Sequence, residues 1–286
     1  MKHFVLVTGA SSGIGEAICQ LLVQNDYEVL AGVRRIEDAE RLSRQYGSKV
    51  HPLILDVTDH EAVKAALSAS ISTIGENMLV AIVNNAGIVV SGSSLHIPIE
   101  EWQKQFDINV MGVIRVTQLF FPLLISGNEQ VNHHPRRIIN MSSVSGLFGS
   151  PFLGPYVASK YALEGYSDSL RRELYMHDVQ VVLIEPGGIK TPIWEKARGA
   201  SQYLGPEHEW MIPLKDKLIE RTIAKSLPVE KVVVKVLHAI RSRNVKNRYL
   251  IKAEAWKFRL IRSLPEEWVD RMIMNRLKAK SRIRPF

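Results

Sequence analysis

The strongest constraint on the fold is a repeated alternation of short apolar runs with amphipathic segments along residues 4–185. We expect strands at 4–7, 28–33, 50–56, 79–84, 137–141 and 179–185, and helices at 16–25, 37–46, 59–74, 100–125 and 155–176. Strands that are apolar throughout are buried on both faces, which favours a parallel sheet covered by helices on each side. The predicted fold class is therefore α/β, with one doubly wound domain of Rossmann type.

The chain shows no linker that would separate two such units. Its 286 residues are 46% hydrophobic and 23% charged, as in ordinary globular proteins. We therefore predict one catalytic domain over residues 1–250 and a basic, partly helical tail over residues 251–286. The pattern weakens after Pro192, and residues 194–227 are interpreted as an insertion, or lid, above the carboxyl ends of the strands, where ligands bind in open sheets.

Cysteine content and apolar run lengths limit the compartment and the chemistry. A single cysteine, Cys19, excludes a disulfide framework and a cysteine-based metal site, so no metal is expected and a reducing cytoplasm is the simplest location. No secretory signal is visible at the N-terminus. The apolar stretches are interpreted as too short to span a bilayer, so an integral membrane protein is not expected.

Most of the positive charge lies in the tail. The chain carries a net charge of +8, and the segment from Lys252 onward holds ten Lys/Arg and four acids, interleaved with Trp256 and Trp268. One interpretation is a helix packed on the fold with a solvated basic face. The other is peripheral contact with an anionic membrane surface. Nucleic acid is not expected as a partner, because no recognition motif accompanies the charge.

A glycine-rich turn, G-x-x-x-G-x-G, follows the first expected strand. Gly9 permits a tight turn, Gly13 lets backbone N–H groups approach a pyrophosphate, and Gly15 lets the next helix lie close to the sheet. The free N–H groups and positive dipole end of that helix favour phosphate. A flexible loop is the simpler alternative, but the position between a strand and a helix favours dinucleotide binding. The other predicted contacts in this turn are Ser11, Ser12 and Ile14.

The end of the second strand bears on the choice of dinucleotide. NAD-binding folds place an acid there to hold the ribose hydroxyls, whereas this chain has Arg34 and Arg35. Two guanidinium groups can hold a 2′-phosphate by charge-assisted hydrogen bonds, so NADP(H) is preferred and NAD(H) is possible. After the third strand, Asp56 and Val57 are expected to contact the adenine, although Asp56 could equally cap the next helix.

Tyr156 and Lys160 lie four residues apart in a predicted helix and share one face. A tyrosine with a pKa near 10 is a poor base at neutral pH, and a neighbouring ammonium lowers that pKa. The pair can therefore exchange a proton with an alcohol or carbonyl oxygen. Such a pair is common by itself, so its significance depends on the motifs around it.

Taken together, the motifs resemble those of the short-chain dehydrogenase/reductase family. The matching pieces occur in the family's order between Thr8 and about Thr191: Thr8-Gly9-x-x-x-Gly13-x-Gly15, Asn84-Asn85-Ala86-Gly87, Asn109, Ser143, Tyr156-x-x-x-Lys160 and Pro186-Gly187. Further short matches, such as Ala31-Gly32-Val33-Arg34 and Leu153-Gly154-Pro155-Tyr156, resemble the branch of retinol and hydroxysteroid dehydrogenases.

The resemblance implies a role for each catalytic residue. Tyr156 would be the acid/base, and Lys160 would depress its pKa and hold the nicotinamide ribose. Ser143 would bond the substrate oxygen, and Asn109 would support a water-linked proton path. Ser142 could be the better-aimed hydroxyl, and Asn109 could be purely structural.

The resemblance also assigns the remaining cofactor contacts. Asn85, Ala86 and Gly87 would shape the cofactor groove, although Asn85 could serve only to satisfy neighbouring backbone groups. The nicotinamide and its carboxamide would be oriented by Pro186, Gly187, Ile189 and Thr191.

The predicted function is an NADP(H)-dependent oxidoreductase that interconverts a hydroxyl and a carbonyl on a bulky apolar, retinoid- or steroid-like substrate. Residues 145–154 are apolar and carry no base, and Trp194, Trp210 and Met211 add apolar surface. A fatty-acyl or polyketide-type carbonyl reductase and a catalytically silent nucleotide-binding regulator are the alternatives. The family's habit of pairing its long helices implies a homodimer or homotetramer through 101–125 and 155–176.

Overall fold

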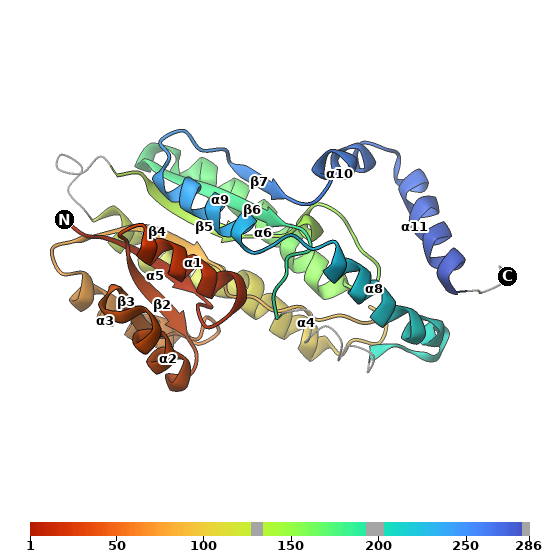
Figure 1. Ribbon diagram of the computed structural model, residues 1–286, viewed down its shortest axis with the longest axis horizontal. Coiled ribbons are helices and arrows are strands. Elements are labelled where there is room, and N and C mark those ends of the chain that lie inside the picture. The colour runs from red at the N-terminus through yellow and green to blue at the C-terminus, as the bar shows by residue number, and fades with distance from the viewer. Residues whose placement is uncertain (127–133, 193–202, 282–286) are drawn as a thin grey trace.

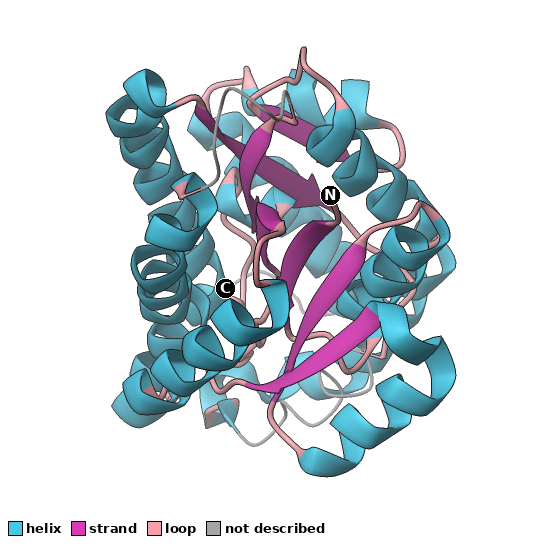
Figure 2. Cartoon of the chain, turned by 90° about the vertical axis from the view of Figure 1, so that its left-hand side faces the viewer, coloured by secondary structure: helices cyan, strands magenta, loops and turns pink. Residues whose placement is uncertain are grey.

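The computed structural model describes residues 1–126, 134–192 and 203–281, and its centre is a parallel sheet of seven strands (Figures 1 and 2). The strands run in the order β3-β2-β1-β4-β5-β6-β7, and every pairing between neighbours is parallel. The prediction of one doubly wound α/β domain is confirmed. The strands are β1 (His3–Thr8), β2 (Glu28–Val33), β3 (Val50–Ile54), β4 (Met78–Asn84), β5 (Arg136–Met141), β6 (Val179–Pro186) and β7 (Arg248–Ile251).

Helices cover both faces of the sheet, as Figure 2 shows. Alternate residues of β1 enter opposite cores, Val5 and Val7 on one face and Phe4 and Leu6 on the other. The first core is closed by α1 (Gly13–Gln24), α2 (Ile36–Tyr46) and α9 (Glu230–Arg241). The second is closed by α3 (His60–Ile74), α5 (Gly112–Ile125) and α6 (Gly154–Glu173). The two-sided burial explains why each central strand is apolar throughout.

The segment expected as one helix over 100–125 is helical throughout but not uniform. It consists of α4 (Ile99–Phe106), one π-helical turn over Asp107–Met111, and α5. By length and composition Ile99–Ile125 could cross a membrane, so the expectation that no apolar stretch reaches that length is wrong. The α5 part of it packs on β4 and α3, where Phe120 and Leu124 are fully buried, whereas Ile99 and Met111 are exposed. Part of the hydropathy of this segment therefore reflects a core position.

The C-terminal third contains more regular structure than its sequence pattern indicated. Helix α9 and strand β7 were not expected, although Val232, Val233 and Val236 show helical spacing and are buried. Strand β7 could not be predicted from the sequence, because it has only four residues, Arg248–Ile251, and three of them are half-buried. It ends at Ile251, one residue beyond the domain boundary predicted from the sequence.

Two helices, α10 (Ala255–Arg262) and α11 (Glu266–Ser281), form the described part of the tail. They project from the end of the body that also carries α8 (Ile212–Ala224) (Figure 1). Phe258 is the buried residue of α10, and its ring packs edge-on against Phe148 at a centroid distance of 6.1 Å. The tail is therefore attached through α10, next to the loop that precedes Tyr156.

Candidate active site

The glycine-rich turn has the shape that a pyrophosphate needs. Gly9 and Gly13 adopt left-handed conformations, with φ of +65° and +59°, which residues with a Cβ rarely tolerate. A Cβ on Gly15 would lie 2.2 Å from the carbonyl oxygen of Gly9. Helix α1 begins at Gly13, so its free N–H groups open onto the turn that includes Ser11, Ser12 and Ile14. These residues fit a dinucleotide phosphate.

Asn85 holds this turn from the neighbouring strand end. Its side-chain amide donates to the carbonyl oxygens of Thr8 at 2.9 Å and Gly9 at 3.1 Å. In return, Thr8 Oγ1 accepts from the backbone N–H groups of Asn85 and Ala86, both at 3.0 Å. The geometry supports the alternative in which Asn85 satisfies backbone groups. A contribution of Ala86 and Gly87 to the cofactor groove stays a prediction.

The rim expected to choose the dinucleotide is exposed to solvent. Arg34 and Arg35 both lie at the end of β2, but Arg35 Nε donates to Asp38 Oδ2 at 3.0 Å. Arg34 is the better candidate for a 2′-phosphate, since Arg35 already has an acidic partner. Sequence reasoning missed Arg41, which donates to the Ser11 carbonyl oxygen at 2.7 Å and forms an ion pair with Glu16. Arg41 therefore links α2 to the phosphate turn.

Of the two roles considered for Asp56, the helix cap belongs to Asp59, and the contact with adenine stays a prediction. Asp59 caps α3, because its carboxylate accepts from the backbone N–H groups of Glu61 and Ala62. Asp56 instead accepts from the Thr58 backbone N–H at 2.9 Å and from the Thr58 hydroxyl at 2.7 Å, through one oxygen. Its second oxygen can meet a ligand at the strand end. Val57 beside it is buried.

The catalytic pair stands at the start of α6, which begins at Gly154. Lys160 Nζ lies 5.7 Å from the centroid of the Tyr156 ring and donates to the Met141 carbonyl oxygen at 2.7 Å. Burial lowers the pKa of Lys160 to about 8. For Tyr156, burial raises the pKa, because it disfavours the charged phenolate. A hydrogen bond with Ser143 lowers the pKa of Tyr156 in part. The structure thus brings Ser143, Tyr156 and Lys160, three of the four catalytic candidates, together at the carboxyl ends of the strands.

Of the two adjacent serines, Ser143 is the one beside Tyr156. Ser143 Oγ accepts from the backbone N–H of Ser145 at 3.1 Å and lies 3.4 Å from the Pro186 carbonyl oxygen. Ser142 turns the other way and lies beside Glu164, where its hydroxyl lowers the pKa of that carboxyl group against the larger effect of burial. The geometry favours Ser143 for contact with a substrate oxygen.

Asn109 lies in the π-helical turn and binds the backbone of Ile88. Its Oδ1 accepts from the Ile88 N–H at 2.9 Å, and its Nδ2 donates to the Ile88 carbonyl oxygen and, at 3.2 Å, to Ser159 Oγ. Sequence reasoning missed Gln105, one turn earlier, which accepts from the Val90 N–H at 2.7 Å and donates to the Ile88 carbonyl oxygen. The spacing of four residues from Asn109 was the available signal. A water path through Asn109 stays a prediction.

The segment after β6 leads back to the phosphate turn. A Cβ on Gly13 would lie 3.6 Å from the Thr191 side chain, so these residues face one another. Ile189 is buried, and the backbone on either side of it is bonded to Leu227. The Gly187 N–H donates to the Ile251 carbonyl oxygen of β7 at 2.9 Å. A dinucleotide lying between the phosphate turn and Pro186-Gly187 would therefore have hydrogen-bonded backbone on both sides.

The described part of the insertion lies against the loop before Tyr156. The Phe152 ring packs edge-on against Trp210 at 6.2 Å and against His208 at 5.2 Å. Met211 is buried, whereas Trp194 lies outside the described residues. A lid over the end of the sheet stays a prediction.

Comparison with known proteins gives matches along nearly the whole chain. The family model described as short chain dehydrogenase matches residues 3–202. An NADPH-dependent 3-dehydrocapnine reductase from Ornithobacterium rhinotracheale is 36% identical over 278 residues, which cover 96% of this chain and 98% of that relative. Mouse retinol dehydrogenase 5 is 34% identical over 191 residues, which cover 66% of this chain and 58% of that relative. The expected likeness to retinol dehydrogenases is confirmed.

A solved structure shares the fold. A short-chain dehydrogenase from Streptomyces avermitilis superposes with a TM-score of 0.76 and 23% sequence identity, covering 100% of this chain and 99% of the other. Its arrangement extends over the C-terminal third, beyond the residues matched by the family model.

The close contact at Gly15 leads to a test of the phosphate turn. Replacing Gly15 with Ala forces a methyl group against the Gly9 carbonyl oxygen, so α1 must move and we expect nucleotide affinity to fall at least tenfold. Gly165→Ala is the matched control, because a Cβ there meets no atom within 4 Å. Fluorescence titration with NADPH measures both variants. Unchanged affinity in Gly15→Ala would contradict the proposed cradle.

Proposed function

The chain belongs to the short-chain dehydrogenase family and is an oxidoreductase, and we propose that it interconverts a carbonyl and a hydroxyl group with NADP(H). The observation that carries the proposal is the convergence of Ser143, Tyr156 and Lys160 at the sheet edge that also holds the phosphate turn. The apolar loop before Tyr156 and the lid packed on it support a bulky apolar substrate.

Two observations support NADP(H) rather than NAD(H). The end of β2 offers exposed Arg34 where NAD-binding folds place an acid. The relative that matches almost the full chain is named as an NADPH-dependent reductase. When bound, the dinucleotide supplies or accepts the hydride.

The residues of the chain supply position and a proton. In the reducing direction, the Tyr156 hydroxyl donates its proton to the substrate oxygen, and Ser143 Oγ bonds the same oxygen. The resulting phenolate is stabilised by the Lys160 ammonium, which the Met141 carbonyl oxygen holds in place. In the oxidising direction the phenolate takes the proton back. Proton transfer and charge stabilisation are thus assigned to different side chains.

The proton-transfer step can be tested by removing a single oxygen atom, that of the Tyr156 hydroxyl. We expect Tyr156→Phe to lower kcat by about 10²-fold or more, the range of general acid–base catalysis. Nucleotide affinity should stay nearly unchanged, since only the hydroxyl is removed. Steady-state kinetics with retinaldehyde, a ketosteroid and 3-dehydrocapnine, together with NADPH titration, separate the two effects. Tyr175→Phe is the matched control, because that ring is exposed just beyond the end of the same helix.

The outcome also separates the alternatives. Turnover of thioester-bound ketones in preference to this panel would favour a fatty-acyl or polyketide-type reductase. Nucleotide binding without turnover of any carbonyl would favour a silent regulator. Substantial activity in Tyr156→Phe would contradict the proposed acid/base.

Cofactor choice is tested at the end of β2. The double change Arg34→Ala with Arg35→Ala should weaken NADPH far more than NADH, because a charge-assisted hydrogen bond contributes about 1.5–3 kcal/mol, or roughly tenfold or more in affinity. Arg34→Ala alone should account for most of the loss, since Arg35 is paired with Asp38. Exposed Arg44, at the far end of α2, gives the control Arg44→Ala. Equal losses for both dinucleotides would rule out a 2′-phosphate contact.

We also propose that the tail contacts an anionic membrane surface. Trp256 on α10 and Trp268 on α11 are 64% and 63% exposed. Lys257 and Arg259 follow Trp256 closely, whereas Trp268 stands between acids and Arg271. Aromatic side chains interleaved with Lys and Arg suit the boundary between lipid headgroups and acyl chains. Because Phe258 joins α10 to the loop before Tyr156, such contact would bring the lid side of the protein toward lipid.

Vesicle sedimentation tests this contact. The protein should sediment with phosphatidylglycerol vesicles at low salt and be partly released as salt rises, because each basic residue contributes about 1 kcal/mol near the surface. Trp256→Ser with Trp268→Ser should weaken sedimentation, while Ile71→Ser, at an exposed site on α3, should not. Equal binding to neutral phosphatidylcholine, or none to either vesicle, would contradict the proposal.

Self-association through the long helices remains a prediction. Met111 and Tyr161 on these helices are about half exposed, and they are the side chains that a partner copy would cover.

A further inference from the structure

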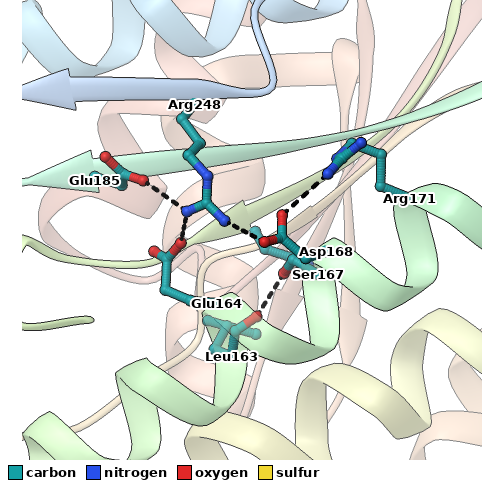
Figure 3. Close-up of polar contacts among 8 residues, drawn as sticks. Leu163, Glu164, Ser167, Asp168, Arg171, Glu185 and Arg248 are labelled. Carbon is teal, nitrogen blue, oxygen red and sulfur yellow. Dashed lines mark hydrogen bonds and ion pairs between the residues drawn. The ribbon is translucent and has the colours of Figure 1, made fainter. Parts of the chain in front are cut away.

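A group of charged residues lies behind the catalytic pair, on the side away from Tyr156. Arg248 of β7 reaches Glu164 of α6, Asp168 of the same helix at 2.8 Å, and Glu185 of β6 at 3.3 Å (Figure 3). The side chains of Glu164 and Glu185 are 8% and 3% exposed, whereas that of Asp168 is 31% exposed. A single guanidinium therefore serves two buried carboxylates from two different elements.

Glu164 connects this group to the active site. It follows Lys160 by four residues, so the two side chains share one face of α6, and both residues are buried. Gly146 packs against this part of α6, since a Cβ there would lie 2.9 Å from Glu164 Cγ and 3.0 Å from the backbone carbonyl oxygen of Lys160. The charge of Glu164 raises the pKa of Lys160, against the larger lowering that burial causes.

The charges that face Glu164 come from every element around it. Lys160 and Asp168 lie on α6, Glu185 on β6 and Arg248 on β7. Arg171 pairs with Asp168, and Arg262 of α10 acts on Glu185. Burial raises the pKa of Glu164 and brings that of Glu185 to about 7, whereas Arg248 lowers both. Without Arg248, the buried carboxyl groups would tend to take up protons and become neutral.

We propose that Glu164 is a positioning residue for the catalytic pair: its carboxylate keeps Lys160 in the ammonium form, and Arg248 keeps Glu164 in the carboxylate form. The inference rests on the proposed function, in which the Lys160 ammonium stabilises the Tyr156 phenolate. It assigns a part in the chemistry to β7, which lies outside the residues matched by the family model.

A titration of Lys160 tests the inference without any turnover. The signal of Lys160 is identified in the spectrum of ¹³C-labelled lysines by its absence from Lys160→Met. In Glu164→Gln, which keeps the shape of the side chain, the midpoint of this signal should fall by about one pH unit, a tenfold change in the protonation equilibrium. Asp168→Asn is the matched control, because it removes an ion pair of the same arginine farther from Lys160 and should leave the midpoint unchanged.

Two further variants separate the charge of Arg248 from its structural contribution. Arg248→Met should shift the Lys160 midpoint in the same direction as Glu164→Gln, and Arg248→Lys should restore most of it. Thermal unfolding of each variant reports whether it folds. Should Arg248→Met fail to fold, Glu164→Gln still decides. An unchanged midpoint in Glu164→Gln, or an equal shift in Asp168→Asn, would overturn the inference.

The kinetic consequence has a definite sign. Losing the Lys160 charge at lower pH leaves the phenolate less stabilised, so the midpoint of the pH profile for alcohol oxidation should move upward in Glu164→Gln. The affinity for NADP⁺ should change little. The failure of the proposed function would appear differently, as a wild-type chain without turnover, and the Lys160 titration would still test the effect of Glu164.

Discussion

Parallel pairing of the strands is the constraint on which the site depends. Because β1, β4, β5 and β6 all run the same way, their carboxyl ends meet at one edge of the sheet. That edge receives the phosphate turn from β1, Asn85 from β4, Ser143 from β5 and Pro186 from β6. The residues are far apart in sequence, and no local interaction would bring them together. An antiparallel pairing of any of these strands would send its contribution to the opposite edge.

The site is held rigid mainly by side chains that bond to backbone. Asn85 holds the phosphate turn, Asn109 and Gln105 hold the segment after β4, and Lys160 bonds the end of β5. Asn109, Gln105 and Lys160 are buried and Asn85 is half-buried, and each has a hydrogen-bond partner, so the cost of removing it from water is offset. These bonds connect the irregular loops to the regular elements on either side of the site. Asn109 and Lys160, which the motifs identify as catalytic candidates, thus also hold backbone segments in place.

The fold could be predicted because its signal is periodic and repeated, whereas the site could be predicted only in part. Strand β2 was expected at its observed bounds, since the five residues after Glu28 carry no polar side chain and the whole strand is buried. The catalytic pair was identified because its spacing occurs together with the other family motifs, in the family's order. Arg41 was missed because its partners, the Ser11 carbonyl oxygen and Glu16, lie far away in sequence. Gln105 stands one helical turn before Asn109, but that spacing alone does not reveal its bond to the Val90 backbone. Arg248 was missed because β7 has no pattern of its own.

The residues that support the site extend into the C-terminal third, beyond the family motifs. The motifs end at about Thr191, yet the turn at Gly187 donates its N–H to Ile251 of β7, and Arg248 of the same strand neutralises carboxylates on both α6 and β6. Strand β7 also closes the edge of β6, whose backbone groups would otherwise be unpaired. The Gly187 end of the site therefore depends on residues that come after the segment 194–227 in sequence. Strand β7 pairs with β6, and helix α9 packs on β5 and β6, so the chain returns to the sheet after that segment and supports the site from the neighbouring strand.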